Sequence, residues 1–392
     1  AFLRQCAGRA GGFGILPGRF HPERLPMPAP ERLLPYWTIA VPPLALAVHF
    51  LLHSGAGPAA AAVLVAALLG AVLSAVHHAE VVARRVGEPF GAVLLALAVT
   101  VIELGLIVSI MFGGQPEPTL LRDTIHATVV LVLHGVAGLC IVVGAIRHRE
   151  QDFSTRGAQA YLTVLLPMVA LTLVLPNFTT SLPGPYYTAT QLAFVSVSCL
   201  VLWLAFTFVQ TVRHREYFLP LPATAAGGAP SPAAVAPARP PGRQSLAALA
   251  LLLLALAAVV LLAKDVSPYL QSLVAKAGAP AALVGVIVAA IVLMPEGMTA
   301  VRAAKKNQLQ TSINLALGSG VASIGLTVPA VSLVAWWTHT PVALGVTPGG
   351  AVLLGLSFLM AILTYGNGRA SLLSGVVHLI LLATWLFLIV VP

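Results

Sequence analysis

Long apolar runs separated by short polar segments divide the chain into candidate membrane spans. Most of these runs are close to the roughly 20 residues that a helix needs to cross a bilayer. The fifth run contains Pro167 and Pro176, so we expect its helix to kink there. The eleven runs fall at 38–53, 57–78, 89–112, 125–146, 160–178, 188–210, 246–263, 281–301, 312–336, 342–364 and 371–391. The pattern predicts an all-α polytopic membrane protein with about eleven transmembrane helices.

The composition of the chain supports a membrane protein and argues against several other classes. Hydrophobic residues make up 58% of the chain and charged residues only 8%, whereas soluble domains carry about 25% charged residues. The net charge of +9 does not indicate nucleic-acid binding, because the basic residues lie in short loops between apolar runs. The three cysteines, Cys6, Cys140 and Cys199, are far apart and predict neither a disulfide framework nor a zinc site. We expect no cofactor.

The positions of the basic residues predict the orientation of the helices. Cytoplasmic loops of membrane proteins are enriched in Lys and Arg. If the N-terminus is cytoplasmic and the C-terminus is outside, 18 of the 21 basic residues fall on the cytoplasmic side, and only Arg122, Lys264 and Lys276 fall on the other. We therefore expect a multi-pass protein of the cell inner membrane in this orientation.

Low-complexity composition marks two segments outside the bundle. Residues 1–37 contain Arg, Pro and Gly without an apolar core, and we expect a disordered cytoplasmic tail there. Residues 213–245 are rich in Ala, Pro and Gly, and they predict a flexible cytoplasmic linker. The linker separates a first transmembrane half at 38–212 from a second half at 246–392. Leaving out the first span gives two groups of five spans.

Two acidic residues lie deep within predicted spans. Of the twelve acids in the chain, ten lie in loops or near span ends, and only Glu103 and Glu296 lie well inside. A charged side chain at the centre of a bilayer costs about 2.5–3.5 kcal/mol on insertion scales, so buried acids usually have a function. We interpret the two residues as a cation-binding and proton-binding site.

The placement of these acids predicts an inverted repeat. Glu103 lies in the third span and Glu296 in the eighth, so the two helices cross the membrane in opposite directions. Two five-helix units of opposite orientation, each with one buried acid, are typical of transporters whose substrate site lies where the repeats meet near the midplane. The chain is then one extra helix followed by two inverted five-helix repeats.

Oxygen-bearing side chains near the two acids fit a hard cation. Thr100 precedes Glu103 by three residues, and Thr299 follows Glu296 by three, so each acid has a hydroxyl on its own helix face. Pro295 frees a backbone carbonyl of its helix. In the ninth span a stripe of hydroxyls and a nearby amide add further oxygens, at Ser312, Ser319, Ser323 and Asn314. Calcium takes about six to eight oxygen ligands, and two carboxylates balance its charge.

These features favour a secondary antiporter. Two nearby carboxylates in a medium of low dielectric resist being charged together, so either a cation or protons must neutralise them. Exchange of Ca²⁺ for H⁺ is our first hypothesis, and exchange of Na⁺ or K⁺ for H⁺ on the same architecture is the alternative. A passive channel is less favoured, because inverted repeats suit alternating access. An intramembrane enzyme is less favoured, because neither an HExxH nor a GxSxG motif occurs in the sequence.

Three further residues are candidates for a proton path. His126 and His134 lie eight residues apart on roughly one face of the fourth span, and histidine titrates near neutral pH. Glu88 precedes Pro89 at the predicted cytoplasmic start of the third span, where it could serve as an entrance. Packing of histidines and helix initiation by Glu88 are the structural alternatives.

At the two buried acids the chain resembles the calcium/cation antiporter superfamily, and within it the bacterial ChaA-type calcium/proton antiporters. The resemblance rests on GEPFGAVLLALAVTVIELGLIVSIM at 87–111 and on MPEGMTAVRAAKKNQLQTSINLALGSGVASIGLTVP at 294–329. It implies cation export driven by proton uptake, with Glu103 and Glu296 carrying cation and proton in turn. It also implies that Asn314 and Ser319 are polar positions of the second repeat. The partners are then small inorganic cations, protons and the lipid bilayer, and the oligomeric state stays open.

Overall fold

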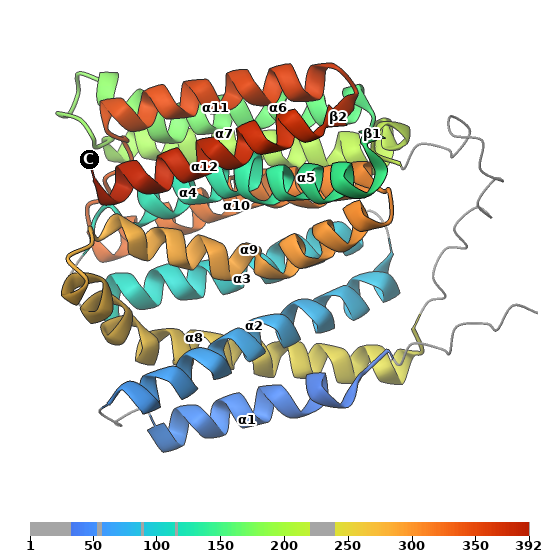
Figure 1. Ribbon diagram of the computed structural model, residues 1–392. Helices are drawn as coiled ribbons and strands as arrows, with labels where there is room; N and C mark the ends of the chain where they lie inside the picture. The colour runs from blue at the N-terminus through green and yellow to red at the C-terminus, as the bar shows by residue number, and fades with distance from the viewer. Residues whose placement is uncertain (1–32, 53–56, 88–89, 114–116, 220–239, 392) are drawn as a thin grey trace, which may run out of the picture. The chain divides into compact units, whose positions relative to one another are not determined.

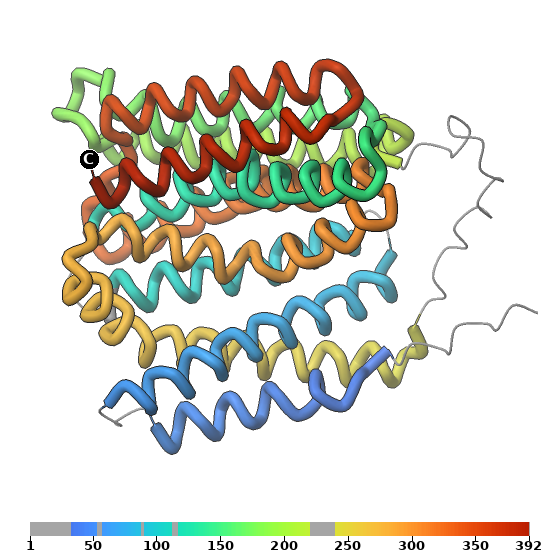
Figure 2. Tube along the Cα trace, in the orientation of Figure 1, coloured from blue at the N-terminus to red at the C-terminus, as the bar shows by residue number. Residues whose placement is uncertain are grey.

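The computed structural model describes residues 33–52, 57–87, 90–113, 117–219 and 240–391. In these residues the chain forms eleven transmembrane segments, which run roughly parallel and antiparallel to one another (Figures 1 and 2). Ten of them are long and apolar enough to cross a membrane, and α1, Tyr36–Leu52, is a shorter apolar helix of 17 residues. The protein is therefore an all-α polytopic membrane protein, as the hydrophobic pattern predicts.

The remaining elements follow the predicted order of spans. The first half contains α2 (Pro58–Val86), α3 (Phe90–Gly113), α4 (Leu120–Val130), the π-helix η1 (Leu131–Val136), α5 (Ala137–His148), β1 (Glu150–Asp152), α6 (Thr155–Val169), η2 (Ala170–Val174), η3 (Leu175–Phe178), α7 (Ala189–Phe208), η4 (Val209–Arg213) and η5 (Arg215–Phe218). The second half contains α8 (Gly242–Lys276), α9 (Ala282–Lys305), α10 (Leu309–Thr338), α11 (Pro348–Gly366), β2 (Arg369–Ser371) and α12 (Leu372–Val390). The segments α4–η1–α5 and α6–η2–η3 each form one span.

Two helices are longer than their apolar runs, because polar residues beyond the runs find partners in the bundle. The predicted end of the second span at residue 78 is wrong: His78 is fully buried, and its Nε2 lies 2.9 Å from the carbonyl oxygen of Thr38 in α1. The predicted end of the seventh span at residue 263 is also wrong. Asp265 pairs with His49 of α1, with 2.6 Å between Nδ1 and Oδ2. Helices α2 and α8 therefore continue past both polar positions.

The sixth helix changes its hydrogen bonding between its two prolines. Helix α6 contains Pro167, and it passes into the π-helix η2 and then into the 3₁₀-helix η3, which contains Pro176. A proline removes one backbone donor and displaces the carbonyl one turn earlier, so regular α-helical bonding cannot continue there. This is the local break that the sequence predicts for the fifth span.

Contacts between the two halves follow an inverted pattern. Counted without α1, each half has five spans. The third span of the second half, α10, packs against α3 and α7, while the third span of the first half, α4–η1–α5, packs against α9 and α12. Two strand pairings repeat this exchange at the two ends of the bundle. Strand β1 follows the third span of the first half and pairs antiparallel with β2, which follows the fourth span of the second half. Conversely, Tyr186 follows the fourth span of the first half and pairs with Ala343, which follows the third span of the second half. Each half thus meets the other through equivalent elements.

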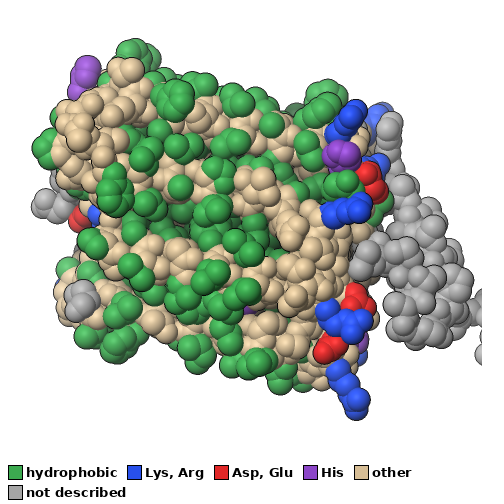
Figure 3. All heavy atoms as spheres, turned by 90° about the horizontal axis from the view of Figure 1, so that it is seen from above, with side chains coloured by type: hydrophobic (Ala, Val, Ile, Leu, Met, Phe, Trp, Pro, Cys, Tyr) green, Lys and Arg blue, Asp and Glu red, His purple; other side chains and the backbone are tan. Residues whose placement is uncertain are grey.

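Basic side chains gather at one end of the bundle. Figure 3 shows Lys and Arg concentrated at the end where α2, α5 and α9 finish. The C-terminus of α12 lies at the opposite end (Figure 1). The exposed basic residues near this end include Arg84, Arg85, Arg147, Arg149, Arg302, Lys305, Lys306 and Arg369. The charge asymmetry used in the sequence analysis is therefore a property of the folded bundle.

The predicted tail and linker lie largely outside the described residues. Nothing is described for residues 1–32 or 220–239, so their disorder and flexibility stay predictions. The beginning of the linker is folded: η5 lies at 215–218, and Phe218 is buried. At the other end α8 begins at Gly242, within the predicted linker.

The contact between α4 and α9 offers a test of the packing. A Cβ atom on Gly285 of α9 would lie 2.8 Å from the backbone carbonyl carbon of Asp123 and from the backbone nitrogen of Thr124. We expect Gly285→Ala to lower the free energy of unfolding by about 1–3 kcal/mol, as overpacking does. Gly355→Ala is the matched control, since a Cβ there meets nothing within 4 Å. Thermal unfolding midpoints in detergent compare the two variants. Equal midpoints would contradict the packing of α4 against α9.

Candidate functional site

Glu103 of α3 is buried and hydrogen-bonded to the other half of the chain. Its side chain is 1% exposed, and its Oε2 accepts hydrogen bonds from Ser323 Oγ and Thr327 Oγ1 of α10, both at 2.7 Å. The two hydroxyls lie four residues apart, so they share one face of α10. Because a buried polar group is costly unless it is hydrogen-bonded, these two bonds allow the carboxyl group to lie inside the bundle.

Glu296 of α9 is in the opposite situation. Its Oε2 is buried, and within the described part of the chain it has no hydrogen-bond partner. The preceding residue, Pro295, is buried in the helix and carries no N–H. An unpartnered carboxyl oxygen in a buried position is unfavourable on its own. A proton, a water molecule or a bound cation would relieve that cost.

The two glutamates belong to one site. Helices α3, α9 and α10 pack against one another, and the charges of Glu103 and Glu296 interact electrostatically. The bundle therefore brings together one acid from each half, Glu103 and Glu296, and two hydroxyls, whose oxygens are of the kind that coordinates a hard cation. Among the described residues there is no cluster of three or more His, Cys, Asp or Glu side chains suited to a metal ion.

A third acid, Glu80 of α2, also acts on this site. Its charge interacts with that of Glu296, while Arg84 donates a hydrogen bond to its Oε2 at 3.4 Å. The side chain is 38% exposed, so Glu80 lies between the aqueous end of α2 and the buried acids. In the sequence, Glu80 lies just beyond an apolar run, where a polar residue is ordinary at the end of a span and gives no signal of a site.

Neither of the predicted threonines contacts a glutamate. Thr100 donates to the carbonyl oxygen of Ala96 at 2.9 Å, and Thr299 donates to that of Pro295 at 3.1 Å. Hydroxyls in helices often bond the carbonyl four residues earlier in this way. Their spacing from the acids is as predicted, but both donors are used within their own helices.

The second-repeat positions Asn314 and Ser319 also lie apart from the hydrogen bonds of the acids. Asn314 Nδ2 donates to the carbonyl oxygen of Phe218 at 2.6 Å, and its Oδ1 accepts from Gln310 Nε2 at 2.8 Å. Asn314 thus fastens the start of the linker to α10. Ser319 is half-buried one turn before Ser323, and no hydrogen bond joins it to either glutamate. The hydroxyl stripe therefore reaches Glu103 through Ser323 and Thr327.

The candidate proton-path residues lie in different places. His126 lines a cavity of about 370 Å³ together with Arg122, Asp123 and Thr347. The ring of His134, in η1, is fully buried and contacts His378 of α12. The structure thus joins neither histidine to the glutamates by a hydrogen bond. Glu88 lies outside the described residues.

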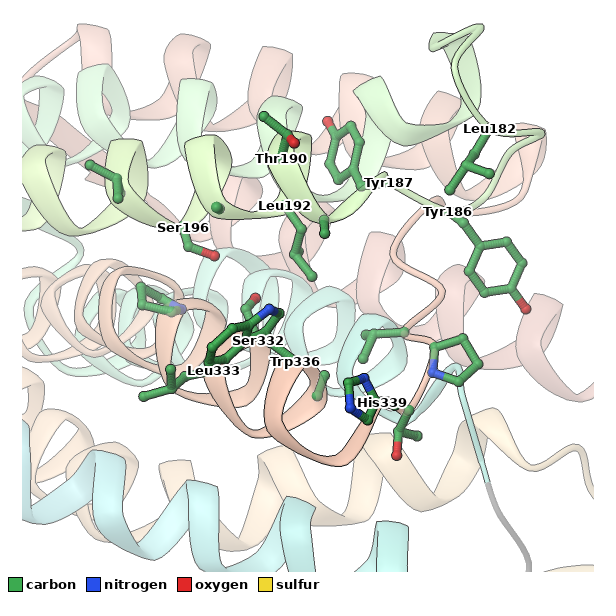
Figure 4. A pocket seen from close by; sticks show the side chains of 18 of the residues that line it. Leu182, Tyr186, Tyr187, Thr190, Leu192, Ser196, Ser332, Leu333, Trp336 and His339 are labelled. Atoms are coloured by element: carbon green, nitrogen blue, oxygen red, sulfur yellow. The ribbon is translucent and has the colours of Figure 1, made fainter.

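One cavity of about 1220 Å³ is lined by neither acid. It lies between α7, the end of α10 and the loop that follows η3 (Figure 4). Leu192, Leu333 and Trp336 line it, and no acidic residue does. Leu333 and Trp336 are also largely exposed. An apolar cavity of this kind has no charge with which to bind a cation.

Comparisons with known proteins show which family the chain resembles. The family model described as sodium/calcium exchanger protein matches residues 57–212 and 247–391. The Sinorhizobium fredii protein y4hA, named as an ionic transporter, is 46% identical over 326 residues, covering 83% of this chain and 87% of that protein. The sodium-potassium/proton antiporter ChaA of Escherichia coli is 32% identical over 356 residues, covering 90% of this chain and 95% of that protein.

Solved structures share the fold. The native structure of YfkE has a TM-score of 0.69 at 18% identity, covering 91% of this chain and 99% of that one. The crystal structure of the H⁺/Ca²⁺ exchanger CAX has a TM-score of 0.64 at 15% identity, covering 89% of this chain and 87% of that one. At these identities the likeness concerns the arrangement of helices.

A double-mutant cycle tests the bond between Glu103 and Thr327. We expect Glu103→Leu and Thr327→Val to couple by about 0.6–1.7 kcal/mol in unfolding free energy, as hydrogen bonds between membrane helices do. The control cycle combines Glu103→Leu with Ser319→Ala, because Ser319 makes no hydrogen bond to Glu103. Reversible unfolding in mixed micelles measures both cycles. Equal coupling in the two cycles would contradict the geometry.

Proposed function

The chain belongs to the sodium/calcium exchanger protein family, and from this premise we propose that it is a secondary cation/proton antiporter whose exchange site is formed by Glu103 and Glu296. The observation that carries the proposal is the pairing of Glu103 and Glu296, two acids from inverted halves of the bundle that each have a buried carboxyl oxygen. One acid is hydrogen-bonded to hydroxyls, and the other has an unpartnered carboxyl oxygen. A site of this kind is incomplete until a cation or a proton occupies it.

The two acids have different parts in the proposed cycle. Ser323 and Thr327 hold the Glu103 carboxyl group in a fixed position between α3 and α10. Glu296 supplies the open oxygen that first meets an arriving cation. The hydroxyl oxygens that donate to Glu103 still have lone pairs, so they can coordinate the same ion. Binding then gathers carboxylate and hydroxyl oxygens from α3, α9 and α10 around one cation.

Exchange follows from competition between cation and proton for these carboxyl groups. Two carboxylates close together in a medium of low dielectric are stabilised either by a cation or by protons, and both states have a reduced net charge. Only such states would allow the inverted halves to rearrange around the site, because an uncompensated charge inside the bundle is costly. Glu80, at the exposed end of α2, is placed to pass ions or protons towards Glu296.

Ca²⁺ is the cation that two carboxylates balance best. A calcium ion takes about six to eight oxygen ligands, which the two carboxylates, the two hydroxyls and water can supply. Exchange of Na⁺ or K⁺ for H⁺ is the second candidate, and the name of the Escherichia coli relative, sodium-potassium/proton antiporter, favours it. One monovalent ion and one proton would balance the same two charges.

The proposed setting is the cell inner membrane. The end of the bundle that carries the basic side chains (Figure 3) would face the cytoplasm, as positive residues do in membrane proteins. The N-terminus would then be cytoplasmic and the C-terminus outside. Proton uptake down its gradient would drive cation export.

Transport in everted membrane vesicles tests the two acids. We expect Glu103→Gln and Glu296→Gln to abolish cation-dependent proton efflux, because an amide neither releases a proton nor balances a cation. A pH-sensitive dye follows the lumen after respiration has acidified it. Glu150→Gln is the control, since Glu150 lies on the exposed strand β1 and pairs with Arg369. Wild-type efflux in either buried variant would contradict the proposal.

The same vesicles identify the cation. We expect Ca²⁺, added alone, to collapse the proton gradient in vesicles that contain the wild-type protein. A response to Na⁺ or K⁺ but not to Ca²⁺ would assign the second candidate and leave the two-glutamate site intact. A failure of all three cations would be inconsistent with antiport of these ions.

A further inference from the structure

A second buried polar cluster lies away from the glutamates, where η1, α11 and α12 meet. His134 and His378 are both 0% exposed, and their Nδ1 atoms lie 2.7 Å apart. On its other side, His378 Nε2 lies 3.0 Å from Thr364 Oγ1 of α11. Helix α12 contacts η1, α5 and α11, and Figure 1 shows α5, α12 and α11 side by side. A chain of three side chains therefore joins three segments.

The hydrogen bond between the rings requires that one Nδ1 carries a proton and the other does not. In the first arrangement His134 donates from Nδ1, and His378 then donates from Nε2 to Thr364. In the second arrangement His378 donates from Nδ1 and accepts at Nε2. Both arrangements leave Nε2 of His134 buried and, among the described residues, without a partner. This hydrogen-bonded chain of three side chains thus has a closed end at Thr364, which bonds His378, and an open end at Nε2 of His134.

The surrounding backbone holds the two rings together. The segment η1 is a π-helix, a local insertion into an α-helix that often occurs at functional sites. One turn later, Gly138 allows close approach, because a Cβ there would lie 2.9 Å from Cβ of His378. The ring of Tyr365 stacks near His378, with 6.3 Å between centroids, and its hydroxyl is buried with no hydrogen-bond partner in the described part of the chain.

The other titratable groups on the segments that pack against the pair make no hydrogen bond or ion pair with it in the described residues. Helix α10 carries none, α12 carries only His378, and α11 carries only Tyr365. The others on the packed elements are Arg122, Asp123 and His126 of α4, Cys140, Arg147 and His148 of α5, Glu296, Arg302 and Lys305 of α9, and Arg369 of β2.

We propose that His134 and His378 form a second proton-binding site, separate from the glutamates, which takes up one proton at His134 and holds it on His378. A proton arrives at the open Nε2 of His134, and the Nδ1 proton of His134 then moves to Nδ1 of His378. His134 ends neutral with its proton on Nε2. His378 ends as an imidazolium whose two N–H groups donate to His134 Nδ1 and to Thr364 Oγ1. One proton enters the pair, and both N–H groups of the His378 imidazolium are hydrogen-bonded.

The role of this site in transport rests on the proposed function. Imidazole is the side chain whose ordinary titration lies nearest neutral pH. A proton held on the pair would not compete directly with a cation at Glu103 and Glu296. The protein could then carry a proton on His378 of α12 while a cation occupies the glutamates. The rate of exchange would then depend on pH through the histidine pair as well as through the glutamates.

The pH profile of exchange in vesicles tests this role. We expect His134→Gln and His378→Gln each to remove one titration step from the wild-type profile while cation-dependent exchange remains measurable. Thr364→Val keeps both rings and removes the acceptor at the closed end, so it should shift that step to lower pH. His148→Gln is the control, because His148 contacts the carbonyl oxygen of Lys305 instead. The role in transport would be overturned if the pH profiles of His134→Gln, His378→Gln and Thr364→Val all matched that of the wild type.

Nitrogen NMR of ¹⁵N-histidine-labelled protein tests proton binding itself. The difference between wild-type and His378→Gln spectra isolates the signals of the pair. We expect them to change from neutral imidazole to a shared imidazolium as the pH falls. If they stay neutral over the whole range in which the protein is folded, the second proton site does not exist. This result does not depend on transport, so it separates a failure of the histidine site from a failure of the proposed antiport.

Discussion

The structure depends on how a carboxyl group is accommodated inside an apolar bundle. Glu103 can be buried because two hydroxyls of α10, Ser323 and Thr327, donate to its Oε2. Since α3 and α10 belong to different halves of the chain, this requirement fixes the crossing of the halves. The inverted exchange of packing partners, α10 with α3 and α7 against α4–η1–α5 with α9 and α12, is built around that crossing.

The two acids are equivalent in the repeat but different in their surroundings. The oxygen of Glu103 is hydrogen-bonded, whereas that of Glu296 is buried and unpartnered within the described chain. The residues of η1 and α5 next to α9 are largely apolar, and a Cβ on Gly297 would meet the side chain of Val136. Glu296 therefore lacks the hydroxyls that Glu103 has. In the proposed exchange, this asymmetry would fix the position of Glu103 and leave Glu296 to bind an arriving cation or proton.

Hydropathy predicts the fold correctly, and the cost of buried charge points to Glu103, which is 1% exposed. Both signals depend on residue type alone. The partners of polar groups depend on which helix faces meet. Thr327 was missed because a hydroxyl in an apolar helix gives no signal of its own. Asn314 fits the second-repeat motif but bonds to Phe218. His378 is 244 residues from His134, and no local pattern connects two single histidines over that distance.

In the proposed exchange, one site binds cation and proton in turn. Proton release on cation binding can be measured with purified protein in weakly buffered detergent solution. We expect binding of Ca²⁺, Na⁺ or K⁺ to the wild-type protein to release protons, and the Glu103→Gln/Glu296→Gln double variant to release none. Cation binding without proton release in the wild type, or undiminished release in the double variant, would contradict it.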